Sequence, residues 1–267
     1  MSDYVLGSDD AEIARLDRQA VALAGASDAL LRMSGIASGM RVLDLGTGLG
    51  HVAYQVAAIV GPEGLVVGVD REAPSLAVAE SRRTTDNVRF LDGDVRTVRF
   101  DEPFDAIVCR LLLFHLPDAV NVLRHHRANL KPGGLIVVLD ADNGSARAEP
   151  EVELVRQVND WIEAAFRAAA AQPRIGARLI PLLREAGYSD VTAIGLQGYI
   201  AAGDPPGPAL FTGVLRTLAP TIVANGIATE EELDLDTLDE RLRLQIEAAG
   251  AVLLPPTIVG AWGRMRS

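Results

Sequence analysis

Three glycines that follow a short apolar segment are the residues of this chain whose types and spacing most directly predict chemistry. The segment 42–45 has the β propensity of a buried strand. Gly46, Gly48 and Gly50 follow it in a G-x-G-x-G pattern, and a helix-compatible stretch, 51–60, comes next. This order of strand, glycine loop and helix is typical of a nucleotide-type cofactor site. Because glycine lets the backbone turn tightly and approach a ligand that a Cβ atom would keep away, we expect the loop to border a bound cofactor.

Two acidic residues further along the chain are placed to bind an adenosine. The apolar run 65–69 ends in Asp70, and an acid at the end of a second strand can accept hydrogen bonds from both ribose hydroxyls. Its neighbour Arg71 is a further candidate contact to the cofactor. A third strand candidate leads to Asp94 and Val95, which can accept from the adenine amino group and donate a backbone N–H to the ring. Together with the glycine loop, these residues predict an adenosine site.

The position of the third glycine distinguishes between two adenosine cofactors. A dinucleotide loop reads G-x-G-x-x-G, so that the pyrophosphate can lie at the helix N-terminus. Here His51 occupies the sixth position, and the third glycine comes one residue early. Asp44, inside the preceding strand, would repel a phosphate but suits an ammonium group. A ligand with an adenosine, no phosphate and an amino-acid tail is S-adenosylmethionine, which we expect here in place of a nicotinamide dinucleotide.

These motifs resemble those of the class I S-adenosylmethionine-dependent methyltransferases. VLDLGTGLG is similar to the first motif of that family, VVGVD to the second and FLDGDV to the third, and the resemblance extends over about residues 40–200. It implies a Rossmann-like α/β fold with a doubly wound, mostly parallel seven-stranded sheet, whose sixth and seventh strands pair antiparallel. It also implies methyl transfer to O, N or C of an acceptor, but one scaffold hosts many chemistries and the motifs do not name the acceptor.

Residues 1–35 are expected to form a helical cap on this core. In several small-molecule methyltransferases such an N-terminal helix closes the cofactor pocket. The resemblance therefore implies Gln19 and Arg15 as candidate partners of the methionine carboxylate, and Tyr4 as part of the roof of the substrate pocket. Arg110, at the end of the fourth strand, is a further candidate for that carboxylate or for an acidic or carbonyl-bearing substrate.

The regular alternation of strands and helices ends after the fifth strand. A long helix is predicted over 151–171, and further helical segments fall within 203–250. We expect a cofactor-binding core of 36–202 and 251–267, with 203–250 inserted as a helical lid to which 151–171 contributes.

Side chains of this lid are expected to help enclose the substrate. Within the insertion, 229–249 reads as one helix that begins at a capping box of Thr229 and Glu232. Trp161 on the long helix and Phe114 after the fourth strand are candidate walls of the pocket. Such apolar walls would bind a fairly apolar metabolite and exclude water from the reaction.

A catalytic side chain is hard to predict, because a sulfonium methyl group needs little more than an aligned nucleophile. Positioning and water exclusion can supply about 7–11 kcal/mol of the barrier. His115, after the fourth strand, is a candidate base for a phenol or amine proton, and the alternative is a histidine that packs under the sheet edge. His125 and His126 are expected on an exposed helix.

A metal-dependent variant of this chemistry is disfavoured. Asp142 and Asn143 follow the fifth strand, where catechol-type methyltransferases use an Asp-Asn pair together with another Asp after the fourth strand. In this chain Arg110 ends the fourth strand, and a guanidinium cannot bind the magnesium ion, which prefers hard oxygen ligands. We therefore expect no metal.

Composition limits the partners and the setting of the protein. A net charge of −11 without a basic run gives no electrostatic footprint for nucleic acid. No signal peptide or membrane span is evident, and Cys109 is the only cysteine, so we expect a cytoplasmic monomer or homodimer.

The predicted activity is methyl transfer to a small, fairly apolar metabolite. The alternatives are a methyltransferase-like cyclase or isomerase, a nicotinamide-dependent dehydrogenase and a non-catalytic binding module.

Overall fold

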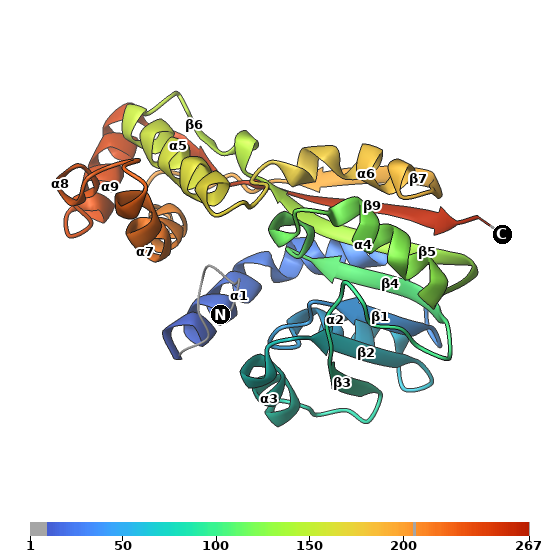
Figure 1. Ribbon diagram of the computed structural model, residues 1–267. Coiled ribbons are helices and arrows are strands. Elements are labelled where there is room, and N and C mark those ends of the chain that lie inside the picture. Colours follow the sequence, from blue (N-terminus) through green and yellow to red (C-terminus); the bar gives the residue numbers. More distant parts are fainter. Residues whose placement is uncertain (1–9, 205–206, 267) are drawn as a thin grey trace.

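The computed structural model describes residues 10–204 and 207–266, and it shows a twisted seven-stranded sheet with helices on both faces (Figure 1). The strands of this sheet are β1 (Arg41–Leu45), β2 (Leu65–Asp70), β3 (Val88–Asp92), β4 (Phe104–Arg110), β5 (Leu130–Asp142), β7 (Tyr188–Leu196) and β9 (Thr257–Met265). Their order is β3-β2-β1-β4-β5-β9-β7. Strands β1 to β5 are parallel, and β9 runs antiparallel between β5 and β7. The predicted doubly wound, mostly parallel sheet is confirmed.

The central strands form because their apolar side chains are buried on both faces of the sheet. β1 and β4 are buried along nearly their whole length, as is typical of parallel strands that helices cover on both sides. In the register of the sheet, Leu43 pairs with Val67 of β2 and with Ile107 of β4. The carboxyl ends of β1, β2 and β4 therefore meet at one edge, which is where open α/β sheets bind their ligands.

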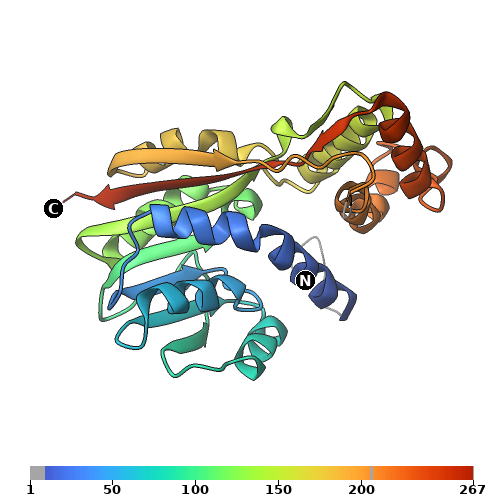
Figure 2. The same cartoon turned by 180° about the vertical axis from the view of Figure 1, so that it is seen from behind.

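Helices cover each face of the sheet. α1 (Asp10–Met33) and α2 (His51–Val60) lie on one face, α4 (Ala119–His126) and α6 (Leu179–Glu185) lie on the other, and α3 (Ala73–Ser81) lies beside β3 (Figures 1 and 2). Successive side chains of a strand point to opposite faces, so Val108 packs with α1 and α2 while Ile107 packs in the cluster that includes α4 and α6.

None of the helices in the described part of the chain is long and apolar enough to cross a membrane. Short 3₁₀ helices join several elements, namely η1 (Leu113–His115), η2 (Arg127–Asn129), η3 (Asn143–Ser145) and η4 (Ile175–Arg178).

A second group of helices, here called the helical unit, lies beyond the carboxyl end of β5 (Figure 1). It consists of α5 (Glu153–Ala168), α7 (Ala209–Ala224), α8 (Glu230–Leu233) and α9 (Leu238–Ala249). A two-stranded sheet of β6 (Arg147–Glu149) and β8 (Val252–Leu254), which the sequence did not predict, flanks these helices. Phe211 and Leu215 of α7 are buried in the same apolar cluster as Phe166 of α5. The segments predicted to form a lid therefore pack on one another, although they lie far apart in the sequence.

The single helix predicted over 229–249 is wrong, because the chain breaks between α8 and α9. Thr229 and Glu232 do form the expected capping box at the start of α8. Asp234 then takes a left-handed conformation with φ of 39°, which an L-residue cannot hold inside a right-handed helix. The helix predicted over 151–171 is also shorter, because Ala170 has φ of 59° and α5 ends before it.

Candidate functional site

The glycine loop between β1 and α2 has the backbone geometry that only glycine adopts readily. Gly46, Gly48 and Gly50 have φ of 67°, 50° and 81°, in the left-handed region where a Cβ atom is strained. A Cβ atom on Gly46 would lie 2.8 Å from the side chain of Leu112, and one on Gly50 would lie 2.9 Å from the ring of Phe90. A Cβ atom on Gly48 would meet nothing within 4 Å. The outer glycines therefore allow close packing, and the central one borders open space that a ligand can fill.

Asp70 is fixed at the end of β2 by two backbone amides. Its Oδ2 accepts a hydrogen bond of 2.8 Å from the N–H of Gly48, and its Oδ1 accepts one of 3.0 Å from the N–H of Glu72. Each carboxylate oxygen has a second lone pair. The structure thus brings Asp70 to the glycine loop, and its contact with the ribose hydroxyls stays a prediction.

Asp44 and Arg110 bring opposite charges to the carboxyl ends of the neighbouring strands β1 and β4. Asp44 is fully buried and accepts a hydrogen bond of 2.7 Å from Thr47 Oγ1. Burial raises the pKa of its carboxyl to about 7, while Thr47 and the charge of Arg110 oppose that rise. Burial also lowers the pKa of the Arg110 guanidinium, whose Nη1 donates to Ser27 Oγ at 3.0 Å. A buried carboxyl with a half-buried guanidinium near it suits the ammonium and carboxylate of an amino-acid tail.

Helix α1 is joined to this edge of the sheet by a carboxylate. Asp17 accepts a hydrogen bond of 2.9 Å from His51 Nε2, and His51 directly follows Gly50. It also accepts two from Arg82, at 2.7 Å and 2.9 Å. Gln19, half-buried on the same helix, stays a predicted partner of the cofactor carboxylate.

At the predicted adenine end, Asp94 is already paired within its own loop. Arg96 donates from Nε and Nη2 to Asp94 Oδ2 at 2.9 Å and 2.6 Å, and this hydrogen bonding holds the pKa of the carboxyl below its usual value. Asp94 would therefore bind an adenine amino group with its remaining lone pairs, and Val95 is half-buried beside it. Arg71 lies near Glu72, with 3.5 Å between Nε and Oε1. The adenine contacts and that of Arg71 stay predictions.

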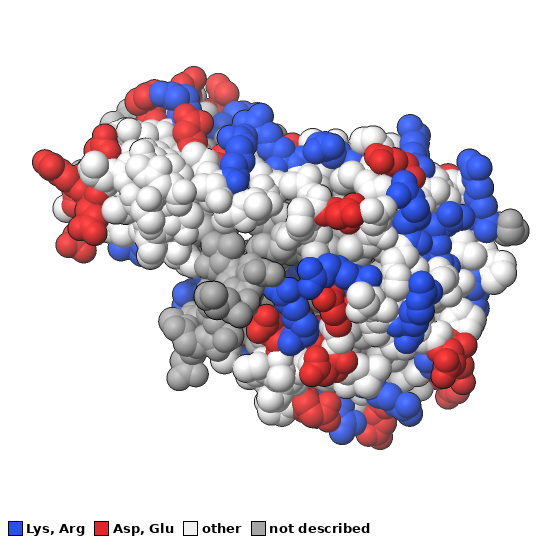
Figure 3. Space-filling model, viewed as in Figure 1, with Lys and Arg blue, Asp and Glu red and all other residues white. Residues whose placement is uncertain are grey.

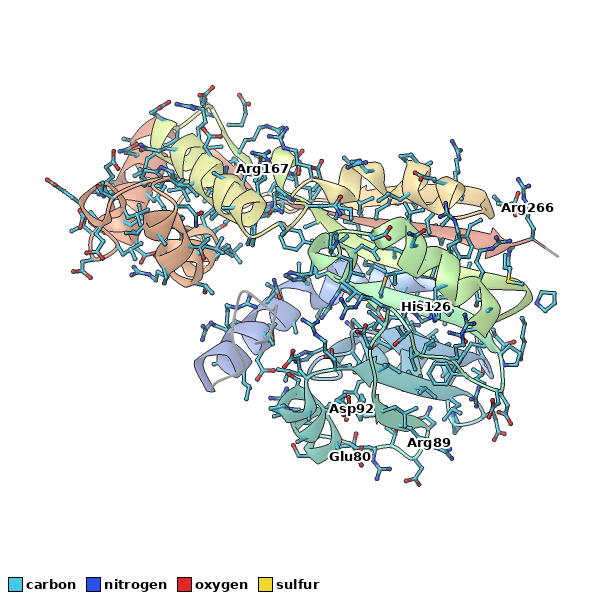
Figure 4. All side chains as sticks on the ribbon, in the orientation of Figure 1. Glu80, Arg89, Asp92, His126, Arg167 and Arg266 are labelled. Atoms are coloured by element: carbon cyan, nitrogen blue, oxygen red, sulfur yellow. The ribbon has the colours of Figure 1, made fainter. Side chains whose placement is uncertain are left out.

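The histidine at the end of α4 is placed differently from the sequence-based expectation. His126 is fully buried in the core (Figure 4). Its Nε2 donates to the carbonyl of Val95 at 2.7 Å, and its Nδ1 accepts from Asn129 at 3.0 Å. Burial lowers the pKa of its imidazole to about 4. The prediction of an exposed His126 is wrong, because the inward face of this short helix extends to its last residue.

The segment after β4 carries the residues predicted to face the acceptor. The backbone N–H of Phe114 donates to Asp140 Oδ2 at 3.1 Å, and its ring meets the ring of Phe166 of α5 edge to face, with centroids 4.7 Å apart. The ring of His115 lies 4.8 Å from that of Phe114. Burial, with the nearby charges of Arg15 and Arg71, lowers the pKa of His115 to about 4. The imidazole is therefore neutral at physiological pH, and it is a weak base.

Of the other predicted pocket residues, Trp161 is buried in the apolar cluster that also contains Phe114 and Phe166. Tyr4 lies outside the described residues. The sequence did not predict two neighbouring cavities where β5 enters the helical unit, of about 60 and about 240 Å³, which both border Asn143 and Asn159. The smaller cavity is mainly apolar and the larger one is lined by charged groups.

The two acids at the end of β5, Asp140 and Asp142, lie within the strand and not after it, and both accept hydrogen bonds from backbone amides. Asp140 is fully buried, accepts from the amides of Phe114 and Ala141, and has its pKa raised to about 7 by burial. Asp142 Oδ1 accepts from the N–H of Gly144 at 3.1 Å. Within the residues that the structure describes, no three His, Cys, Asp or Glu side chains come together as a metal site.

Comparisons with known proteins cover this site and the core around it. A family model described as "Methyltransferase domain" matches residues 36–187. A 2-phytyl-1,4-naphtoquinone methyltransferase of Synechococcus elongatus is 37% identical over 152 residues, which cover 53% of this chain and 61% of that protein. An arsenite methyltransferase of Aquipseudomonas alcaligenes is 39% identical over 113 residues, covering 38% of this chain and 33% of that protein. The chain thus spans less than two thirds of the length of either relative.

Solved structures extend the likeness of the fold to most of the chain. A putative methyltransferase from Bacillus halodurans C-125 has a TM-score of 0.56 at 19% identity, covering 90% of this chain and 99% of the other. A Haemonchus contortus phosphoethanolamine N-methyltransferase 2, solved with S-adenosylhomocysteine, has a TM-score of 0.56 at 18% identity, covering 91% and 52%. At these identities the likeness shows a shared fold.

Proposed function

The chain belongs to the class I S-adenosylmethionine-dependent methyltransferases, and from this premise we propose that it transfers a methyl group to O, N or C of a small, fairly apolar metabolite. The observation that carries the proposal is the buried carboxyl of Asp44, with the positive charge of the half-buried Arg110 near it, beside a glycine loop that is open at Gly48. A carboxyl and a guanidinium near each other suit a zwitterionic amino-acid tail, whereas the carboxylate of Asp44 would repel the pyrophosphate of a dinucleotide. The site therefore fits S-adenosylmethionine better than a dinucleotide.

The residues of the site have distinct proposed roles toward the cofactor. Asp44 would hold its ammonium group, and Arg110 would hold its carboxylate with help from Gln19. Asp70 would accept from the ribose hydroxyls, and the adenine would lie beside Asp94, with Val95 and Arg71 next to it. When bound, the cofactor supplies an electrophilic methyl group, so the task of these residues is to orient it and to exclude water.

We propose His115 and Phe114 as the residues nearest the acceptor. The neutral imidazole of His115 is a weak base, which can accept a hydrogen bond from an acceptor hydroxyl or amine and so orient it. The edge-to-face rings of Phe114 and Phe166 offer an apolar surface next to it. The names of the two relatives, a naphthoquinone and an arsenite methyltransferase, also support a small acceptor.

The helical unit is proposed as the substrate-selecting lid. In this division residues 1–35 form a cap, 36–202 and 251–267 form the core, and 203–250 form the lid with the help of 151–171. The packing of α5 on α7 and the two cavities at the end of β5 support this role. Trp161 and Tyr4 stay proposed walls of the pocket.

A nucleic-acid substrate does not fit the charge of the protein. The net charge is −11, and on the face shown in Figure 3 basic and acidic side chains are interspersed. Neutralising many phosphates needs a basic surface.

The proposals that the protein works in the cytoplasm, and as a monomer or homodimer, rest on the sequence alone.

Ligand binding tests the proposed cofactor. In titration calorimetry with the purified chain, S-adenosylmethionine and S-adenosylhomocysteine should bind, and NAD should not. Binding of NAD without binding of either adenosyl ligand would overturn the proposal in favour of a dehydrogenase. A protein that binds the adenosyl ligands but never forms S-adenosylhomocysteine would be a binding module or a non-methylating enzyme.

A further inference from the structure

The two halves of helix α1 are attached to the protein in different ways. In the second half, Leu30 and Leu31 are fully buried against the sheet, and Ser27 is buried where it accepts from Arg110. The first half projects beyond the sheet (Figures 1 and 2). Among its described side chains only Ala20 is buried, and Val21 is 79% exposed. Apolar burial therefore contributes little to holding the first half in place.

The first half of α1 is held by a carboxylate, that of Asp17, which accepts hydrogen bonds from His51 and Arg82. Asp17 Oδ1 accepts from His51 Nε2 at 2.9 Å and from Arg82 Nη1 at 2.7 Å, and Oδ2 accepts from Arg82 Nη2 at 2.9 Å. The two parallel bonds from Arg82 are the bidentate geometry that makes an arginine–carboxylate pair strong. They are also the main reason why the pKa of Asp17 lies below its usual value.

Both partners of Asp17 belong to elements that flank the glycine loop. His51 is the first residue of α2 and directly follows Gly50. Arg82 directly follows α3, and a Cβ atom on Gly50 would lie 3.2 Å from Ala79 of that helix. The contacts of Asp17 thus join α1, α2 and α3 next to the loop that the cofactor is proposed to occupy.

We propose that Asp17 is a positioning residue that latches the first half of α1 over the cofactor site. In the latched state α1 forms one wall of the site, and the cofactor exchanges when Asp17 releases Arg82 and His51. The proposal rests on the proposed S-adenosylmethionine site, but the residues of the latch are separate from those proposed to touch the cofactor. Since the side chains of Asp17 and Arg82 are 38% and 36% exposed, salt should weaken the latch.

The dissociation rate of S-adenosylhomocysteine tests the latch, measured by competition in stopped flow with the full chain. Asp17→Asn keeps the size of the side chain but removes its charge, and it should speed dissociation by about 3- to 10-fold. Asp17→Glu, which retains the charge, should restore part of the slow rate. The matched control is Asp28→Asn, which removes an exposed ion pair with Arg32 on the same helix and should leave the rate unchanged. Arg82→Gln breaks the same latch from α3 and should match Asp17→Asn.

Further readouts separate a latch from a merely structural role. The ligand-free melting temperature of Asp17→Asn should stay close to that of the parent, while hydrogen exchange in the first half of α1 becomes faster. High salt should speed dissociation in the parent and have less effect in Asp17→Asn. Unchanged dissociation in both Asp17→Asn and Arg82→Gln, or an equal effect of Asp28→Asn, overturns the latch alone. A parent protein that binds no S-adenosylhomocysteine overturns the proposed function and the latch with it.

Discussion

The backbone N–H of Gly48 donates a hydrogen bond of 2.8 Å to Oδ2 of Asp70, which ties the middle of the glycine loop to the end of the neighbouring strand. Gly48 is also the loop glycine whose missing side chain faces open space. One carboxylate therefore shapes the loop and faces the position proposed for the ribose. Substitution of Asp70 should affect cofactor binding more than it affects the fold.

Removing the charge of Asp70 should weaken the adenosyl ligand. A hydrogen bond to a charged group contributes about 1.5–3 kcal/mol, so Asp70→Asn should raise the Kd of S-adenosylhomocysteine by about 10- to 150-fold. Titration calorimetry measures the change. Asp86→Asn, at a fully exposed position, is the control and should bind as the parent does. Equal affinity of Asp70→Asn and the parent would assign Asp70 to the loop alone.

Arg110 should recognise the amino-acid tail and no other part of the cofactor. Arg110→Met removes the half-buried guanidinium, and the protein should still fold because Asp44 can take up a proton near neutral pH. The Kd of S-adenosylhomocysteine should rise by about 10- to 150-fold. The Kd of 5′-methylthioadenosine, which lacks the tail, should change little. An equal loss for both ligands contradicts the proposed role.

Cofactor affinity should depend on pH through Asp44. Burial raises the pKa of this carboxyl to about 7 in the free protein, and an ammonium group at the site favours the ionised form. Binding should therefore release a proton below pH 7, and affinity should fall by up to about tenfold per pH unit as the pH decreases. Calorimetry in two buffers of different ionisation enthalpy detects the proton. Asp44→Asn should bind weakly and show no such dependence, and a pH-independent parent would contradict the assignment.

The lid proposal predicts that the helical unit matters more for methyl transfer than for cofactor binding. Leu215 of α7 is fully buried, so Leu215→Ala should lower the free energy of unfolding by about 2–5 kcal/mol. Chemical denaturation measures this loss. The Kd of S-adenosylhomocysteine should stay within a few-fold of the parent, while turnover drops strongly. A parallel loss of affinity and turnover would place the effect in the core.

Features of the site that depend on local pattern could be predicted from the sequence. The strands around Asp44 and Asp70 are short apolar runs followed by glycine or acid, and the parallel order of such strands fixes where their carboxyl ends lie. The capping box of Thr229 and Glu232 spans only four residues and could equally be predicted. These features need no knowledge of distant contacts.

Contacts between segments that are far apart in the sequence could not be predicted from local sequence patterns. Asp17 lies 34 residues from His51 and 65 residues from Arg82 in the sequence. The sequence around an acidic residue on a helix does not indicate which distant basic residue it will contact. His126 looked exposed because its helix is short and polar, and its burial depends on the loop that supplies Val95. The pairing of β6 with β8 depends on the path of the chain through the helical unit.

Methyl transfer itself is tested most directly by incubating the full chain with S-adenosylmethionine that carries a deuterated methyl group and an extract of small metabolites. Mass spectrometry then follows S-adenosylhomocysteine and labelled products. We predict that S-adenosylhomocysteine accumulates only with the extract, together with an equal amount of one small, fairly apolar molecule that carries the deuterated methyl group. Absence of S-adenosylhomocysteine with every extract, or a label found only in protein or nucleic acid, would contradict the proposed function.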